Sequence, residues 1–158
     1  MTTFLVAYAS KHGSTQQVAE AIAKRLAEQG DAVDLRPAAA VRGRVGADVV
    51  VLGGALYSGR WHRDAHRFLK RHREELALVP VAVFGMGPRS GEAEGWDRSR
   101  HQLDRALAKH QQLRPAAVAV FGGVDPEPHR GEPPRDLRDW TAIQAWADSV
   151  RDLTPQAR

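Results

Sequence analysis

The stretch Tyr8-Ala9-Ser10-Lys11-His12-Gly13-Ser14-Thr15 is a short polar segment with one glycine, and it lies between two regular elements. Residues 4–8 have the apolar run of a buried strand, and residues 16–29 carry apolar side chains at helical spacing. A helix N-terminus has unpaired N–H groups and about half a positive elementary charge, which together bind anions. Hydroxyl groups within the stretch add side-chain donors. The sequence therefore predicts a phosphate-binding loop here.

The same alternation of strand and helix continues along the chain. Further strands are expected at residues 32–35, 48–52, 80–84 and 116–121, and further helices at 61–76, 93–109 and 140–153. Residues 38–46 are weakly patterned and have room for a short helix. The alternation predicts an α/β fold, a doubly wound parallel sheet of five strands in the order 2-1-3-4-5. With 158 residues, the chain is expected to form one domain over residues 1–158.

Three segments rich in glycine or hydroxyl groups follow expected strands. They are residues 10–15 after the first strand, 53–61 after the third and 85–91 after the fourth. The carboxyl ends of parallel strands lie at one edge of the sheet, and in the order 2-1-3-4-5 these three strands are neighbours. The three segments are therefore expected to form one ligand site.

Other phosphate-binding patterns fail at named positions. A dinucleotide fold needs Gly-x-Gly-x-x-Gly after the first strand, where the only glycine is Gly13. A nucleotide-hydrolysing P-loop needs Gly-Lys-Ser or Gly-Lys-Thr, whereas Gly13 is followed by Ser14. A phosphoacceptor receiver domain needs carboxylates at the ends of the first and third strands, where this chain has Ser10 and Gly53.

Composition excludes several further classes. The chain has no cysteine, which excludes disulfides, thiolate metal sites, iron–sulfur clusters and thiol nucleophiles. His62 and His66 have the i, i+4 spacing of a metal pair, but no third ligand accompanies them, so no metal site is expected. A net charge of +4 is too small to indicate nucleic-acid binding. Neither a signal peptide nor a membrane span is recognisable, so a cytoplasmic protein is expected.

The first loop and the start of the helix after it carry a recognisable pattern. An aromatic, a hydroxyl residue, a small residue and a threonine are followed by alanine and an aliphatic residue, at Tyr8, Ser10, Gly13, Thr15, Ala19 and Ile22. This pattern resembles the signature of the flavodoxins, a family that holds FMN with its phosphate in the first loop. One position departs from the signature, because Ala7 stands where a larger apolar residue is usual, which is a packing difference. The resemblance covers essentially the whole chain and implies a flavodoxin-like three-layer sandwich with FMN as cofactor.

Within the flavodoxin-like families, residues 53–62 look most like the menaquinone-dependent protoporphyrinogen IX dehydrogenases. The dipeptide Asp139-Trp140 also fits that group. Those enzymes carry a longer aromatic and basic insertion before the last helix, where this chain has only the proline-rich residues 125–135. The resemblance therefore carries the fold and the cofactor further than the substrate.

The resemblance also implies roles for the three segments. Gly59 occupies the place where flavodoxin-like proteins turn a peptide toward the N5 proton of the reduced flavin. Trp61 begins an apolar helical stripe, so it is either a cover over the flavin or part of the core. No side chain is implied as catalytic, because the flavin performs the hydride and electron transfer. The phosphate would be wrapped by Ser10, Lys11, His12, Gly13, Ser14 and Thr15, and the isoalloxazine flanked by Ala55, Leu56, Tyr57, Ser58, Gly59, Gly85, Met86, Gly87, Pro88, Arg89 and Ser90.

Three functions stay open. The first is an FMN-dependent oxidoreductase similar to protoporphyrinogen dehydrogenase, passing electrons to a quinone. The second is a soluble one-electron carrier, although carriers of this family are typically acidic and this chain has a pI of about 10.0. The third is a binding module that has lost the flavin. The basic stretch over residues 60–73 is either a solvated helix face or a docking surface for a carboxylate-bearing substrate such as a porphyrin, a redox partner or anionic lipid.

Overall fold

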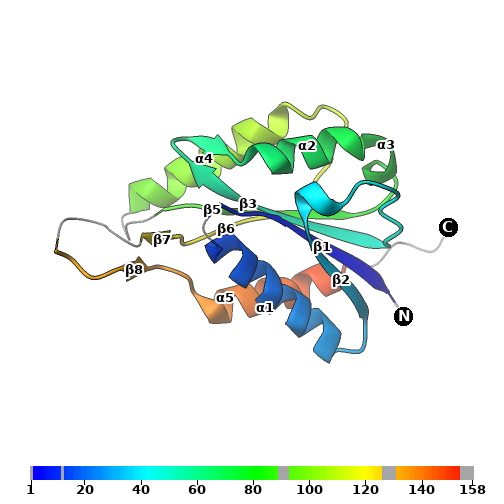
Figure 1. The fold of residues 1–158 in the computed structure, drawn as a ribbon, viewed down its shortest axis with the longest axis horizontal. Coiled ribbons are helices and arrows are strands. Elements are labelled where there is room, and N and C mark those ends of the chain that lie inside the picture. Colours follow the sequence, from blue (N-terminus) through cyan, green and yellow to red (C-terminus); the bar gives the residue numbers. More distant parts are fainter. Residues whose placement is uncertain (1, 12, 89–92, 126–130, 154–158) are drawn as a thin grey trace.

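The computed structural model describes residues 2–11, 13–88, 93–125 and 131–153. At its centre, five parallel strands lie in the order β2-β1-β3-β5-β6 (Figure 1). This arrangement confirms the predicted order 2-1-3-4-5, because β5 and β6 are the fourth and fifth parallel strands in the chain. The strands are β1 (Thr3–Ala9), β2 (Ala32–Pro37), β3 (Val49–Tyr57), β5 (Val81–Met86) and β6 (Ala117–Phe121).

Helices cover both faces of this sheet, which gives the expected three layers. On one face lie α1 (Ser14–Glu28) and α5 (Trp140–Arg151), and on the other lie α2 (Arg63–Arg71), α3 (Arg73–Leu76) and α4 (Ala93–Ala108) (Figure 1). The short helix expected within residues 38–46 is present as a 3-10 helix, η1 (Ala38–Ala40). A small antiparallel pair, β7 (Val124–Asp125) and β8 (Arg135–Asp136), precedes α5.

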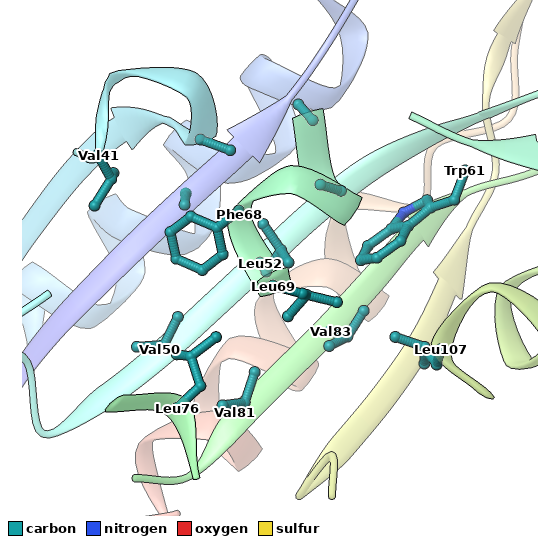
Figure 2. Close-up of a cluster of buried hydrophobic side chains, with 14 of the residues drawn as sticks. Val41, Val50, Leu52, Trp61, Phe68, Leu69, Leu76, Val81, Val83 and Leu107 are labelled. Carbon is teal, nitrogen blue, oxygen red and sulfur yellow. The ribbon is translucent and has the colours of Figure 1, made fainter. Parts of the chain in front are cut away.

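Successive side chains of the central strands point to opposite faces of the sheet, and so they contribute to two separate hydrophobic cores. Phe4 of β1 belongs to the cluster covered by α1 and α5, whereas its neighbour Leu5 belongs to the cluster under α2 and α4. Strands covered on both faces read as continuous apolar runs, which is why the sequence identified them. Figure 2 shows the second cluster, where Leu52 and Val83 of the sheet lie beside Leu69 of α2.

The structure corrects the predicted end of the third strand. β3 continues through Gly53 and Gly54 to Tyr57 instead of ending before the glycine pair. A Cβ on Gly53 would stand 2.0 Å from Cζ of Phe84, and a Cβ on Gly54 would stand 2.4 Å from Nε1 of Trp61. The glycine pair therefore admits two aromatic rings against the sheet and is not a loop.

A tight hairpin follows β3. Strand β4 (Arg60–Trp61) turns back and pairs with the last two residues of β3. Ser58 and Gly59 form the turn, with left-handed φ values of +48° and +79°. Positive φ at both central residues is what a two-residue type I′ turn requires, and its twist suits the flanking strands. Trp61 therefore lies in a strand and not at the start of the following helix.

The helix predicted over residues 61–76 differs from the observed structure in two places. It begins later, after His62, whose Nδ1 accepts a hydrogen bond from the backbone N–H of Asp64 at 3.1 Å. It is also divided into α2 and α3 at His72. His72 is buried, and its Nε2 lies 2.9 Å from the carbonyl oxygen of Val41, which ties the end of α2 to the segment after η1.

Candidate functional site

A cavity opens at the carboxyl ends of the parallel strands. Its walls come from the loop after β1 with the start of α1, the end of β3, the end of β5 and the segment after β6. The first three are the segments that the sequence places at this edge. The lining residues are Ser10, Lys11, Ser14, Thr15, Ala55, Leu56, Tyr57, Met86, Gly87, Gly123 and Val124.

The first loop is shaped by Ser10 and Gly13. The backbone N–H of Gly13 donates to Oγ of Ser10 at 2.9 Å, which closes the loop on itself. Gly13 precedes α1 with a φ of +89°, a conformation that glycine adopts without steric cost. The first turn of α1 has no acidic residue, so the positive end of the helix dipole keeps its charge. His12, also predicted for this loop, lies outside the described residues.

Thr15 combines full burial with an unused hydroxyl. The residue has 0% relative exposure, and its Oγ1 has no hydrogen-bond partner among the described residues. A buried polar group without a partner costs about 1–3 kcal/mol, so such groups are normally paired. Because Thr15 also lines the cavity, its hydroxyl is placed to bond a ligand there. A phosphate oxygen at the N-terminus of α1 fits this requirement.

Lys11 and Tyr57 connect the first loop with the end of β3. Nζ of Lys11 lies 5.0 Å from the centroid of the Tyr57 ring, within cation–π distance. Lys11 is exposed and adds positive charge beside the N-terminus of α1. The cavity thus combines a cation, a helix N-terminus, an aromatic ring and apolar walls, which suits a ligand with an anionic part and a flat apolar part.

Trp61 does not line the cavity. It is 3% exposed and packs edge-on against His66, with the ring centroids 5.4 Å apart, in the core under α2. Figure 2 shows the Trp61 indole at the end of the cluster away from Leu76. Of the two roles that the sequence left open for Trp61, the structure places it in the core.

The other predicted residues take several positions around the cavity. Ser58 and Gly59 form the exposed tip of the β3–β4 hairpin. Gly85 and Pro88 are buried beside the lining residues but are not among them. Arg89 and Ser90 lie outside the described residues.

Gly123 and Val124 belong to the cavity but were not predicted for it. The backbone N–H of Gly123 donates to the carbonyl oxygen of Pro88 at 2.9 Å, which holds the segments after β5 and β6 together. The glycine pair after the fifth strand was the available signal. Gly122 has a packing reason, because a Cβ there would stand 2.2 Å from the carbonyl oxygen of Leu137.

A histidine pair joins α2 to the segment after α4. Nδ1 of His66 is 2.8 Å from Nε2 of His110, and the two rings are stacked. Burial, together with the neighbouring His110, lowers the pKa of His66 to about 4. Burial also lowers the pKa of His110, as do the nearby Lys70 and Lys109.

The predicted i, i+4 histidines thus have separate partners, since His62 caps α2 and His66 bonds His110. In the described ranges, no group of three or more histidine or acidic side chains is placed to hold a metal ion. No helix in the described part of the chain is both long and apolar enough to cross a membrane.

Residues 5–127 match a family model described as Flavodoxin domain. The chain belongs to the flavodoxin family. The matched range includes the first loop, the β3–β4 hairpin and every residue that lines the cavity. The cofactor of this family is FMN, and the redox chemistry of the flavin gives the class of function. The helix N-terminus of this flavodoxin-family protein and the Thr15 hydroxyl, which bonds none of the described residues, fit the FMN phosphate.

Two curated relatives of this flavodoxin-family protein carry the same name. Protoporphyrinogen IX dehydrogenase (quinone) of Escherichia coli (strain K12) is 24% identical over 122 residues, which are 76% of this chain and 67% of the relative. The enzyme of that name from Leishmania major is 25% identical over 126 residues, and the chain spans 53% of its length. Among solved structures, oxidised flavodoxin 2 from Bacillus cereus matches with a TM-score of 0.65 at 21% identity, covering 95% of this chain and 98% of that protein.

Proposed function

We propose that this protein is an FMN-dependent oxidoreductase that takes electrons from a porphyrinogen and delivers them to a quinone. The names of the relatives from Escherichia coli and Leishmania major support this substrate and acceptor. The observation that carries the cofactor part is the buried hydroxyl of Thr15, which lines the cavity at the start of α1 and has no hydrogen-bond partner in the described part of the chain.

In this proposal the first loop holds the FMN phosphate. Ser14 and Thr15 donate their hydroxyls and the backbone N–H groups of the first helical turn, while Lys11 contributes charge. Ser10 holds the loop in shape, because its Oγ already accepts the hydrogen bond from the backbone N–H of Gly13. His12 completes the predicted set.

The ends of β3 and β5 flank the isoalloxazine in the same proposal. Ala55 and Met86 are buried, so they form apolar walls that keep water from the ring. Leu56, Tyr57 and Gly87 complete the described walls, and the exposed turn at Ser58 and Gly59 stands at the edge of the ring. Bound FMN supplies the hydride and electron transfer, and the chain binds and orients it.

A one-electron carrier is the second candidate. The match with Bacillus cereus flavodoxin 2 extends over nearly the full length of both chains, whereas the match with the Escherichia coli dehydrogenase covers 67% of that enzyme. The pI of about 10.0 counts against this candidate, because it requires an acidic partner.

Two measurements test these assignments. The absorption spectrum of the purified protein, with FMN added if needed, should show bound flavin; a protein without flavin bands would contradict both redox functions. Anaerobic oxidation of protoporphyrinogen IX with a menaquinone analogue should then give turnover. Absence of turnover, together with reduction of the bound flavin in two separate one-electron steps, would favour the carrier.

A further inference from the structure

A second hollow, separate from the FMN cavity, adjoins the β3–β4 hairpin. The hairpin is a wall common to both, since Tyr57 lines the first cavity and Gly59 lines the second. The turn rests against α4, where a Cβ on Gly59 would be 3.6 Å from Nε2 of Gln102. The residues that line this hollow are Gly59, Asp97, Arg98, His101, Gln102 and Arg105.

The cations of this hollow come from one face of α4. Arg98, His101 and Arg105 are spaced i, i+3 and i+7, so they lie along the same side of the helix. All three are exposed. Within the described ranges, neither Arg98 nor Arg105 forms an ion pair, and Asp97 is the one acidic residue of the lining.

A neighbouring arginine on the same helix provides a contrast. Nε of Arg100 lies 3.0 Å from Oδ1 of Asp104, so its charge is already compensated. Arg100 is not part of the hollow. The arginines of α4 are thus divided into one that is paired away from the hollow and two that line the hollow without an ion pair to any described residue.

The hairpin brings a further cation to this place. Arg60 is exposed and is paired through its backbone with Tyr57, directly beside the FMN cavity. Later cations of the basic stretch lie elsewhere: Lys70 and Arg73 line hollows where α3 leads toward the amino end of β5. The cations beside the β3–β4 hairpin are therefore Arg60, Arg98 and Arg105, and not the whole of residues 60–73.

We propose that the hollow between the β3–β4 hairpin and α4 binds the carboxylate groups of the substrate. Arginine is suited to this task because its planar guanidinium bonds a carboxylate through two parallel N–H groups. A small molecule with two carboxylates balances the two arginines, while its tetrapyrrole ring extends over the hairpin toward the FMN cavity. This assignment rests on the proposed function, and it names the part of the chain that recognises a porphyrinogen by its acidic side chains.

The test uses the FMN-loaded protein and protoporphyrin IX, the coloured oxidation product, as probe. Its affinity is measured by fluorescence titration for the wild type, for the double variant Arg98→Gln/Arg105→Gln and for the control Arg100→Gln. Loss of charged hydrogen bonds should weaken binding of protoporphyrin IX in the double variant by about tenfold or more. The control should bind like the wild type, and retained flavin absorption shows that each variant is folded.

The dimethyl ester of protoporphyrin IX separates carboxylate recognition from stacking of the ring. The ester should bind the wild type more weakly than the free acid and should be insensitive to the arginine substitutions. Equal affinity of wild type and double variant for the free acid would overturn the proposal. So would an ester that binds as tightly as the acid, or an acidic redox protein whose affinity falls in the double variant while that of protoporphyrin IX does not.

Turnover distinguishes failure of this site from failure of the proposed function. If the wild type oxidises protoporphyrinogen IX but the double variant has an unchanged KM, the carboxylate site is wrong and the function stands. If no turnover occurs but protoporphyrin IX binding depends on Arg98 and Arg105, the function is wrong and the carboxylate site stands.

Discussion

At the scale of single residues, two hydroxyl side chains of the first loop differ in what they already bind. Ser10 accepts the backbone N–H of Gly13 at 2.9 Å, whereas the buried hydroxyl of Thr15 has no partner among the described residues. The first hydroxyl therefore stabilises the loop before any ligand arrives. The second is available to the ligand, and the protein without ligand bears the cost of its burial.

Thr15→Val and Ser10→Ala should consequently change stability in opposite directions. Valine keeps the branched shape and removes an unsatisfied hydroxyl, so the FMN-free protein should unfold at a free energy about 1 kcal/mol higher. Ser10→Ala should lower that free energy by a similar amount, because it leaves the Gly13 N–H without its acceptor. Chemical denaturation of the FMN-free variants measures both.

The same two variants should both bind FMN more weakly. Loss of a hydroxyl bond to the phosphate should raise the Kd of Thr15→Val by about 10- to 100-fold. Thr15→Ser, which keeps the hydroxyl, is the matched control for affinity. FMN titration followed by quenching of flavin fluorescence gives the Kd, and an unchanged affinity of Thr15→Val would contradict the phosphate assignment.

Gly53 is a packing position, and a methyl group there should be costly. A Cβ at 2.0 Å from Cζ of Phe84 forces a shift in the centre of the sheet, so Gly53→Ala should lose about 2 kcal/mol of stability. Gly43→Ala is the control, since a Cβ there meets nothing within 4 Å. Adding Phe84→Leu to Gly53→Ala should recover part of the loss in denaturant unfolding. Strict additivity of the two substitutions would show that their side chains do not compete for space.

At the scale of elements, the β3–β4 hairpin determines how the two hollows are separated. Its turn places Ser58 at a φ of +48°, the one described residue other than glycine with a positive φ. Asparagine followed by glycine is the preferred sequence for such a turn. The hairpin is therefore held in a conformation that its own sequence only partly favours.

Ser58→Asn should stabilise the protein by about 0.5 kcal/mol, because asparagine tolerates the left-handed conformation better than serine. Ser58→Val should destabilise it, since a β-branched side chain is strained at this φ. Midpoints of thermal unfolding for the two variants, each with the flavin removed, provide the comparison. Equal midpoints would mean that the turn does not retain this geometry in solution.

The sequence predicted the parallel strands well but misjudged the hairpin, and both results have a physical cause. Strands covered on both faces, such as residues 49–52, are recognisable as unbroken apolar runs. The glycine pair at 53 and 54 looked like a strand end because its reason is distant: Phe84 lies on another strand, and only the fold brings it close. Glycine alone does not distinguish a turn from a close approach.

The candidate site shows the same division. The position of the first loop follows from its place between a strand and a helix, which the sequence displays. The sequence does not show whether the Thr15 hydroxyl caps its own helix or remains free for a ligand, because hydroxyl residues at the start of a helix commonly cap it. Here Gly13 takes the capping position without a side-chain bond, and Thr15, the second residue of α1, bonds no described residue through its hydroxyl.

At the scale of the whole molecule, the histidine pair between α2 and the segment after α4 makes stability depend on pH. The pKa of His66 is lowered to about 4, and that of His110 lies below its ordinary 6.5. In the unfolded chain both rings take up protons near pH 6.5, so between that pH and about 4 the unfolded state binds more protons. Stability therefore falls as the pH is lowered through this window.

After allowance for partial exposure of the rings, the free energy of unfolding should be about 1 kcal/mol lower at pH 5 than at pH 7. Lys70 and Lys109 face the pair and oppose its protonation. The double variant His66→Gln/His110→Gln should show a shallower dependence, whereas His101→Gln, an exposed control, should leave it unchanged. Denaturation at a series of pH values measures the slope, and equal slopes for all three proteins would exclude the pair as its source.

The order in which the two cores receive their residues bears on how the protein forms during synthesis. The face under α2 and α4 draws its buried residues from positions 5–107, whereas the opposite face also needs Ile143, Ala147 and Val150 of α5. A nascent chain therefore closes one side of its sheet while Ile22 and the rest of the α1 stripe still lack their cover. Because α1 follows the loop that we propose to hold the FMN phosphate, we expect cofactor loading to follow the release of α5 from the ribosome.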